Sequence, residues 1–536
     1  MSNLPQDLVQ MGTKRNIMRE IREYGLLRAR EVGAENVLDF SLGNPSVAPP
    51  AQVNDTIRAI LDSPEGASIH GYTTAQGDWS VRQALADSLS RRFGGSYGPG
   101  DLYLTVGAAA ALCCCFRALA CPGDEFVLFA PFFTEYTYFV SGNGGKPVVV
   151  PPDYATFQPD LTAFESAVGP RTKGVVVNSP NNPSGVVYSA DTLRAIAAIL
   201  RRKAAAYGHP IYLISDEPYR EIVFAGFSTP WLPDFYDDTL VCYSYSKSLS
   251  LPGERIGYIL VPPAAAEHDA LYAAVCGAGR VLGYVNAPSL FQRVAAACDG
   301  LTADLTVYQT NRDLLYHGLT GMGYTCVEPG GTFYLLLQSP EPDAAAFCQR
   351  AREYDLLFPP TDDFACPGWC RIAFCTSTKT VQRALPVFER LAKEYGLAEN
   401  KKNRAGQQAV RLCSSVSGGF QAQSAAAQRR PQGDAQGRGG DDGHRGVEDG
   451  GGELQRQGGQ GHHGLEPLHQ DAVVGHALEE VEDVVGHATQ HGPQQASGVG
   501  QLLVVDIPGH HQARHRTHQT LGEKGDPALG GVEGVG

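Results

Sequence analysis

The stretch SYSKSLSLPGERIG, residues 244–257, places one lysine among small hydroxyl residues, with an arginine eight residues later. A lysine amine can form a Schiff base with a carbonyl compound when its surroundings keep the amine unprotonated. Arg255 can hold a phosphate through two parallel hydrogen bonds, and the hydroxyl groups of Ser244 and Ser246 can donate further ones. Lys247 and these neighbours therefore predict a site for an aldehyde that also carries a phosphate.

Further polar or small residues stand directly at the ends of apolar stretches that are typical of β-strands. Lys247 itself ends TLVCYSYSK, Asp216 ends PIYLISD, Asn182 follows GVVVNSP, and Gly107 follows DLYLTV. In an open sheet of this kind, ligands bind outside the carboxyl ends of the strands. Gly107, Ala108 and Ala109 also begin a helical segment, whose first amides can hold a phosphate. We therefore expect these residues to surround the predicted lysine.

The same set indicates which aldehyde is bound. A buried carboxylate such as Asp216 would keep a pyridine nitrogen protonated, because a negative charge favours the charged form of its partner. Phe133, in PFFTEY, offers a flat face on which a ring can stack. The predicted cofactor is pyridoxal phosphate. No metal is predicted, because Cys113–Cys115 would point in different directions on a helix and no cysteine spacing is typical of zinc.

Alternating strands and helices must position these residues. The strand-like stretch over residues 102–106 is followed by a helical one, and residues 190–207 place apolar side chains on one helical face. This alternation predicts an α/β fold with a mostly parallel sheet and helices on both faces. Beyond about residue 290 the stretches GTFYLLLQ and CRIAFC, with helical segments between and after them, indicate a smaller α+β domain.

We expect four regions along the chain. Residues 1–45 form an N-terminal segment that joins the small domain, residues 46–290 the large cofactor-binding domain, and residues 291–397 the small domain. Residues 398–536 are of low complexity: from residue 401 onwards the chain holds 28 of its 62 glycines and a single aromatic residue. Because such a composition has little apolar surface to bury, we interpret this tail as disordered or as non-native translation.

Charge and apolar content exclude several classes of partner. The chain has 43 Lys and Arg against 57 Asp and Glu, without a basic block, so nucleic acid is not an expected partner. Its beginning has no apolar leader, and no run of some 18 apolar residues occurs, so we expect neither export nor a membrane span. The thirteen cysteines are expected to be reduced thiols. A cytoplasmic enzyme is the prediction.

On these motifs, residues 15–397 resemble the class I/II aminotransferases of the fold-type I pyridoxal-phosphate superfamily. Residues 244–257 are similar to the lysine signature of that family, NNPSG to its Asn-Pro-Thr-Gly element, and SDEPYR to its Asp-x-x-Tyr element. The resemblance implies that Lys247 carries the cofactor and that Asp216 pairs with its pyridine nitrogen. It also implies that Asn182 and Tyr219 contact its phenolic oxygen.

The resemblance also covers the substrate and the assembly. HGYTTAQG resembles the segment whose tyrosine, here Tyr72, reaches the phosphate of a neighbouring subunit, which implies a homodimer. CRIAFCTS resembles the segment whose arginine, here Arg371, binds the substrate α-carboxylate. SLGNPSV resembles the segment that closes over substrate, so Gly43 and Asn44 are expected there, together with Asn182.

Two positions depart from the family pattern. The phosphate turn GAAAAL lacks the hydroxyl residue that is often present, so Ala108 and Ala109 can offer backbone amides only. The stacking position holds Phe133, where tyrosine or tryptophan is commoner. Neither departure removes a required group.

The implied reaction moves an amino group from an L-amino acid to a 2-oxo acid. A β-lyase or decarboxylase on the same fold is an alternative, because residues that hold the cofactor do not determine which bond at Cα breaks. A non-catalytic relative that senses the cofactor or binds a partner is a further alternative, which the presence of Lys247 and Asp216 disfavours. Acidic donors are weakly favoured over neutral or aromatic ones. Arg280 is the candidate for the second cation, and a structural role for it is equally open.

Overall fold

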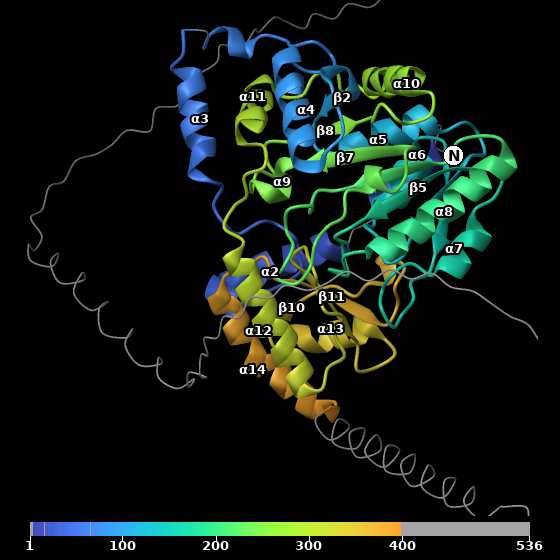
Figure 1. Cartoon of the computed structure of the whole chain (residues 1–536). Coiled ribbons are helices and arrows are strands. Elements are labelled where there is room, and N and C mark those ends of the chain that lie inside the picture. Colours follow the sequence, from blue (N-terminus) through green and yellow to red (C-terminus); the bar gives the residue numbers. More distant parts are fainter. Residues whose placement is uncertain (1–3, 15–16, 65, 398–536) are drawn as a thin grey trace, which may run out of the picture. The chain divides into compact units, whose positions relative to one another are not determined.

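The computed structural model describes residues 4–14, 17–64 and 66–397, which Figure 1 draws as coloured ribbons. The prediction for residues 398–536 lies outside these described residues.

Seven strands form the main sheet, in the order β2-β8-β7-β6-β5-β3-β4. They are β2 (Leu102–Thr105), β3 (Glu125–Phe129), β4 (Lys146–Val150), β5 (Thr172–Asn178), β6 (Tyr212–Asp216), β7 (Thr239–Ser244) and β8 (Gly257–Leu260). Four neighbouring pairs are parallel, and the two pairs that contain β8 are antiparallel. The predicted mostly parallel sheet is thus confirmed. Because β8 opposes both of its neighbours, β2, β5, β6 and β7 all end at the same edge.

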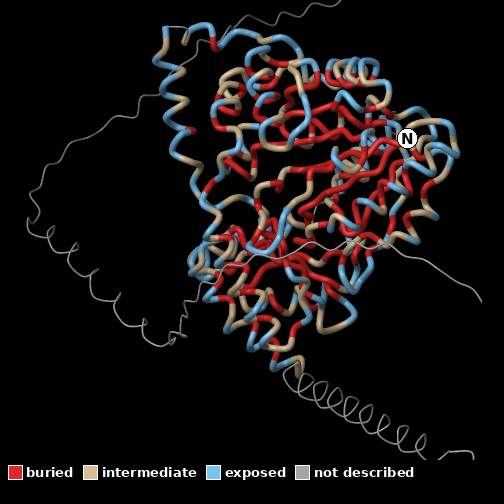
Figure 2. The backbone as a smooth tube through the Cα atoms, in the orientation of Figure 1, coloured by how far each residue is buried: buried red, intermediate tan, exposed pale blue. Residues whose placement is uncertain are grey.

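Alternate side chains of each strand serve two different cores, as the pleat of a strand requires. Phe126 and Leu128 of β3 pack with helices α5 (Ala108–Leu119), α6 (Tyr136–Gly142) and α10 (His268–Val281). Val127 and Phe129 of the same strand point to the other face, toward α7 (Leu161–Ala167) and α8 (Ala190–Tyr207). The sheet therefore lies between two helical layers. Its central strands are buried, whereas the edge strand β4 is partly exposed (Figure 2).

Local capping determines where the long helices begin and end. The side chain of Ser189 accepts a hydrogen bond from the amide of Thr192 and so starts α8. The helix ends at Gly208, whose φ of 74° lies in the left-handed region that glycine adopts most readily. The predicted helix over residues 190–207 is confirmed with these bounds.

The C-terminal part of the described chain is built around a smaller two-stranded antiparallel sheet. Its strands are β9 (Tyr334–Gln338) and β11 (Trp369–Ala373), packed with α12 (Thr306–Met322), α13 (Ala344–Arg352) and α14 (Thr378–Glu394). Strand β1 (Leu38–Asp39) pairs in parallel with β10 (Leu356–Leu357), so the N-terminal segment joins this part of the fold. The remaining helices are α1 (Gln6–Thr13), α2 (Ile17–Val32), α3 (Ala51–Leu61), α4 (Trp79–Phe93), α9 (Tyr245–Ser248) and α11 (Ser289–Cys298). None of the helices in the described ranges is long and apolar enough to cross a bilayer.

Candidate active site

A cavity of about 270 Å³ lies at the edge where β5, β6 and β7 end. It is lined by most of the residues that the sequence predicts for the site, from the main sheet, the N-terminal segment and the small sheet. These are Gly43, Ala108, Ala109, Phe133, Asn182, Asp216, Tyr219, Ser244, Ser246, Lys247, Arg255 and Arg371. Asn44 and Tyr72 do not line it, and Gly107 lies directly behind Arg255.

The sequence predicts Lys247 at the end of a strand. In the structure it lies in the one-turn helix α9, which follows β7. Strand β7 ends at Ser244, whose side chain accepts a hydrogen bond from the amide of Ser246 at 3.1 Å and starts α9. The Nζ of Lys247 donates to the carbonyl oxygen of Gly43 at 2.8 Å. Burial, together with the charges of Arg371 and Arg255, lowers the pKa of Lys247 to about 8. About a tenth of these amines is therefore unprotonated at pH 7, far more than for a lysine of ordinary pKa.

Asp216 presents one engaged and one unengaged carboxylate oxygen. Its Oδ2 accepts a hydrogen bond from the hydroxyl of Tyr136, whereas its buried Oδ1 has no hydrogen-bond partner among the described residues. Burial raises the pKa of Asp216 to about 7, although the bond from Tyr136 acts in the opposite direction. A cation that approached Oδ1 would satisfy this oxygen and stabilise the ionised carboxylate.

Asn178, the last residue of β5, connects two strand ends. Its Nδ2 donates to the backbone carbonyl of Asp216 at 2.9 Å, and its Oδ1 accepts from the amide of Asn182 at 2.8 Å. The position of Asn182 relative to Asp216 is therefore determined by one buried amide side chain.

Hydroxyl groups, a guanidinium and helix amides converge at the start of α5. Gly107 has a φ of 89°, and a Cβ placed on it would lie 2.5 Å from the Nη2 of Arg255. The Nη1 of Arg255 lies 3.4 Å from the Oγ of Ser246, to which Ser244 donates at 2.6 Å. Glycine adopts this positive φ readily and leaves room for the arginine in this position, and the arrangement suits a phosphate.

Arg371 lies on β11 and is 2% exposed. Its Nη1 donates to the Oδ1 of Asn182 at 3.3 Å, and its guanidinium carbon lies 4.6 Å from the ring centroid of Tyr334. The hydroxyl groups of Tyr334 and Tyr219 are 3.2 Å apart. Small-sheet residues thus meet the large sheet inside one cavity.

Several residues of the site were not predicted from the sequence. They are Met18, Tyr136, Asn178 and Tyr334. Tyr136 and Tyr334 stand in stretches that the sequence marks as apolar, and a hydroxyl group in such a stretch is the signal that could have identified them. Met18 has no such signal. Arg280 is exposed at the end of α10 and does not line the cavity.

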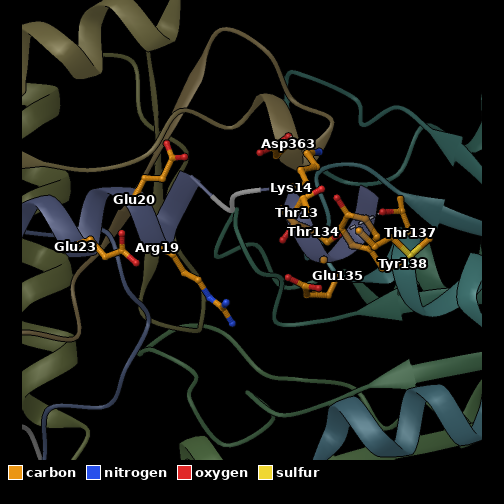
Figure 3. Close-up of a pocket in the computed structure, with 12 residues that line it drawn as sticks. Thr13, Lys14, Arg19, Glu20, Glu23, Thr134, Glu135, Thr137, Tyr138 and Asp363 are labelled. Carbon is orange, nitrogen blue, oxygen red and sulfur yellow. Dashed lines mark hydrogen bonds and ion pairs between the residues drawn. The ribbon is translucent and has the colours of Figure 1, made fainter. Parts of the chain in front are cut away.

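A second cavity, of about 560 Å³, lies next to the first, between the N-terminal helices and the segment that follows Phe133. Figure 3 shows Lys14, Arg19, Glu135 and Asp363 around it, with Lys14 and Asp363 3.5 Å apart in an ion pair. Met18 and Phe133 line the first cavity, and the residues that follow each of them line the second. The two cavities therefore share a wall.

The residues present fit pyridoxal phosphate. The unsatisfied Oδ1 of Asp216 matches a protonated ring nitrogen, the glycine turn with Arg255 matches a phosphate, and the amine of Lys247 matches an aldehyde. Within the described ranges, no group of three or more His, Cys, Asp or Glu side chains is placed to hold a metal ion.

Comparisons with known proteins agree with this geometry. The model of the family "Aminotransferase class I and II" matches residues 35–388. The aspartate/prephenate aminotransferase of Thermus thermophilus is 31% identical over 380 residues, which is 69% of this chain and 94% of that protein. Among solved structures, an amino transferase from Eubacterium rectale is 49% identical with a TM-score of 0.72, covering 74% of this chain and 100% of the other. The Thermus thermophilus aspartate aminotransferase solved with maleate is 28% identical with a TM-score of 0.63, covering 73% and 100%. The chain therefore belongs to the class I and II aminotransferases, which are transaminases that depend on pyridoxal phosphate.

Proposed function

We propose that the chain transfers an amino group from an L-amino acid to a 2-oxo acid, with Lys247 as the residue that bonds the cofactor covalently. The observation that carries this proposal is the amine of Lys247, held in one cavity with Asp216 and Arg371. A nucleophile, a carboxylate for the ring and a cation for the substrate are the groups that the reaction requires.

Pyridoxal phosphate, when bound, supplies an aldehyde and an electron-withdrawing ring that stabilises negative charge at the substrate Cα. In our proposal the free oxygen of Asp216 would pair with the ring nitrogen, and Phe133 would pack against the ring. Asn182 and Tyr219 would hold the phenolic oxygen. The phosphate would be held by Ser244, Ser246, Arg255 and the first amides of α5, from Gly107, Ala108 and Ala109.

Lys247 acts twice in this proposal. With a pKa of about 8, its amine is unprotonated in a useful fraction of molecules, so it can attack an aldehyde. When it is not bonded to the cofactor, the same amine would accept the proton of the substrate Cα as a general base. The N–H that donates to the carbonyl of Gly43 holds the amine inside the cavity and leaves the lone pair of the unprotonated amine available for both roles.

The substrate is proposed to bind with its α-carboxylate on Arg371, between Asn182 and the segment that contains Gly43 and Asn44. Acidic donors such as aspartate are favoured, because the named relatives include aspartate aminotransferases and one was solved with maleate, a dicarboxylate. The second carboxylate needs a second cation. Arg280 can supply it only from a neighbouring subunit, because in its own chain it lies outside the cavity.

A homodimer with shared sites is the proposed assembly. Tyr72 is 98% exposed, and Asn286 holds the adjoining segment through a bond of 2.8 Å to the carbonyl of Thr73. Val281 and Val285, just before Asn286, are also exposed. This apolar surface suits a second copy of the chain. Tyr72→Phe should weaken cofactor retention without changing the sedimentation of the dimer, and a fully active monomer would contradict the assignment.

A cytoplasmic location is proposed as well. Every described cysteine carries a free thiol, including the pair Cys115 and Cys242, whose sulfur atoms are only 3.5 Å apart. Thiols in such proximity are typical of a reducing compartment.

The absorption spectrum of the purified protein tests the proposed function. The parent protein should be yellow, its band should shift when an amino acid is added, and a 2-oxo acid should then become aminated. Lys247→Ala should lose the covalent attachment and, with it, turnover by orders of magnitude, whereas the exposed Lys379→Ala should behave like the parent. Full activity of Lys247→Ala would refute the assignment. Release of carbon dioxide or of a β-substituent would identify the alternative reactions.

A further inference from the structure

The hydrogen bonds of Arg371 leave little room for a carboxylate. Its Nη2 donates to the backbone carbonyl of Ser41 at 2.6 Å and to the Sδ of Met18 at 3.0 Å. Its Nη1 donates to Asn182. Its buried Nε has no hydrogen-bond partner in the part of the chain that the structure describes.

A guanidinium carries five N–H groups and binds a carboxylate through two parallel bonds along one edge. Both edges of Arg371 that can do so include Nη2, and both hydrogens of Nη2 are engaged, by Ser41 and Met18. A carboxylate must therefore replace one of these two acceptors. The carbonyl of Ser41 belongs to a residue that is fully buried, whereas Met18 is only partly buried and its side chain has three rotatable bonds.

We propose that Met18 is a specificity-determining residue, whose thioether occupies the α-carboxylate position on Arg371 until the substrate displaces it. This inference rests on the proposed function, because it assumes that Arg371 binds the α-carboxylate. The next residue, Arg19, borders the second cavity (Figure 3), and we place the displaced thioether on that side. Thioether sulfur is a weak acceptor and a carboxylate is a strong one, so the exchange favours substrate.

The exchange has a consequence for selectivity. The net binding free energy of a carboxylate compound on Arg371 is that of its own hydrogen bonds minus that of the bond from Arg371 to Met18, which is lost. Small carboxylates that offer no further contacts should therefore bind weakly, and amino acids that also fill the rest of the cavity should be selected over them.

Met18→Leu tests the proposal, because leucine has a similar volume and cannot accept a hydrogen bond. The probe is propanoate, which has no amino group, titrated into the cofactor-loaded protein by calorimetry. The freed and buried N–H of Arg371 should tighten propanoate binding by about two- to tenfold. Met11→Leu is the matched control, because Met11 lines only the second cavity, and it should leave the affinity unchanged. Equal or weaker binding by Met18→Leu would overturn the inference.

A second measurement needs no variant at residue 18. Mild peroxide oxidation followed by mass spectrometry should show Met18 becoming sulfoxide faster when propanoate is present, relative to Met322, which packs against the core of the small sheet. An unchanged or slower rate would contradict the displacement. Arg371→Met separates the proposed role of Arg371 in binding the carboxylate from the proposed role of Met18. If propanoate binds this variant as well as the parent, the proposed substrate site is wrong, whereas loss of binding leaves only the role of Met18 to be decided by the tests above.

Discussion

Replacing Lys247 by methionine should stabilise the cofactor-free protein. Burial lowers the pKa of Lys247 from 10.5 to about 8, and a shift of this size corresponds to about 3 kcal/mol of unfavourable free energy for the protonated amine in the folded state. The bond from its Nζ to Gly43 offsets about 1 kcal/mol of this cost. Methionine removes both contributions while keeping similar length and volume. We therefore expect the free energy of unfolding at pH 7 to rise by about 2 kcal/mol.

The advantage of the variant should disappear as the pH rises. The folded lysine releases its proton near pH 8 and the unfolded lysine near 10.5, so the unfolded chain binds more protons between these values. Stability rises with pH wherever the unfolded state binds more protons, so the parent gains on the variant in this window. The difference between the two proteins should be largest below pH 8, at about 2 kcal/mol, and should fall to about zero at pH 10.

Urea unfolding of both cofactor-free proteins, followed by circular dichroism at pH 7 and pH 10, measures these differences. Lys379→Met, at an exposed position, is the control and should change stability by less than about 0.5 kcal/mol at either pH. If Lys247→Met is no more stable than the parent at pH 7, or if its advantage is the same at both pH values, the buried amine does not have the cost that we assign to it.

Two further substitutions test the cofactor contacts. Tyr136→Phe removes the hydroxyl that donates to Asp216 and should raise the pKa of that carboxyl further. Equilibrium dialysis should therefore show that this variant binds pyridoxal phosphate about tenfold more weakly than the parent. The control is the buried Tyr188→Phe, remote from the cavity, which should bind the cofactor like the parent. Gly107→Ala should lose phosphate affinity, because its Cβ would contact the guanidinium of Arg255. Inorganic phosphate as a competitor of cofactor binding measures this affinity. The control is Gly144→Ala, where the φ of 92° is similar and nothing lies within 4 Å, so this variant should lose stability only. Equal phosphate affinity in the two alanine variants would show that the close contact at residue 107 has no role in binding.

Residues at strand ends could be predicted because the sheet itself brings them together. Asp216 and Asn182 follow apolar strands, and parallel strands end at one edge whatever the details of packing. The same reasoning holds for Gly107, although its strand reaches that edge only because β8 opposes both neighbours, which the sequence does not show. Lys247 was expected at the end of a strand, and it lies one helical turn beyond, because the hydroxyl of Ser244 caps that turn.

The unpredicted residues depend on packing between distant segments. Tyr136 meets Asp216 across 80 residues of sequence, and Met18 meets Arg371 across 353. Neither contact follows from a period or a spacing, since each is decided by how a helix packs on a sheet or how the N-terminal segment crosses the cavity. The contact of Tyr334 is equally unpredictable. The alternation of side chains along β9 predicts which face of the strand Tyr334 occupies, but it does not predict that Tyr219 lies opposite.

The position of β2 in the sheet has a consequence for the order in which the protein can fold during synthesis. Among the described strands, β2 pairs with β8 alone, which follows it by about 150 residues, whereas β3 to β7 pair with one another and β7 also with β8. On the ribosome, the five strands from β3 to β7 can therefore assemble while β2 still lacks a partner. The two halves of the phosphate site, the turn after β2 and the arginine before β8, then come together in the same late pairing event. A nascent chain should accordingly be unable to retain pyridoxal phosphate until residue 260 has left the exit tunnel, and the cofactor would favour the completed sheet over every shorter one.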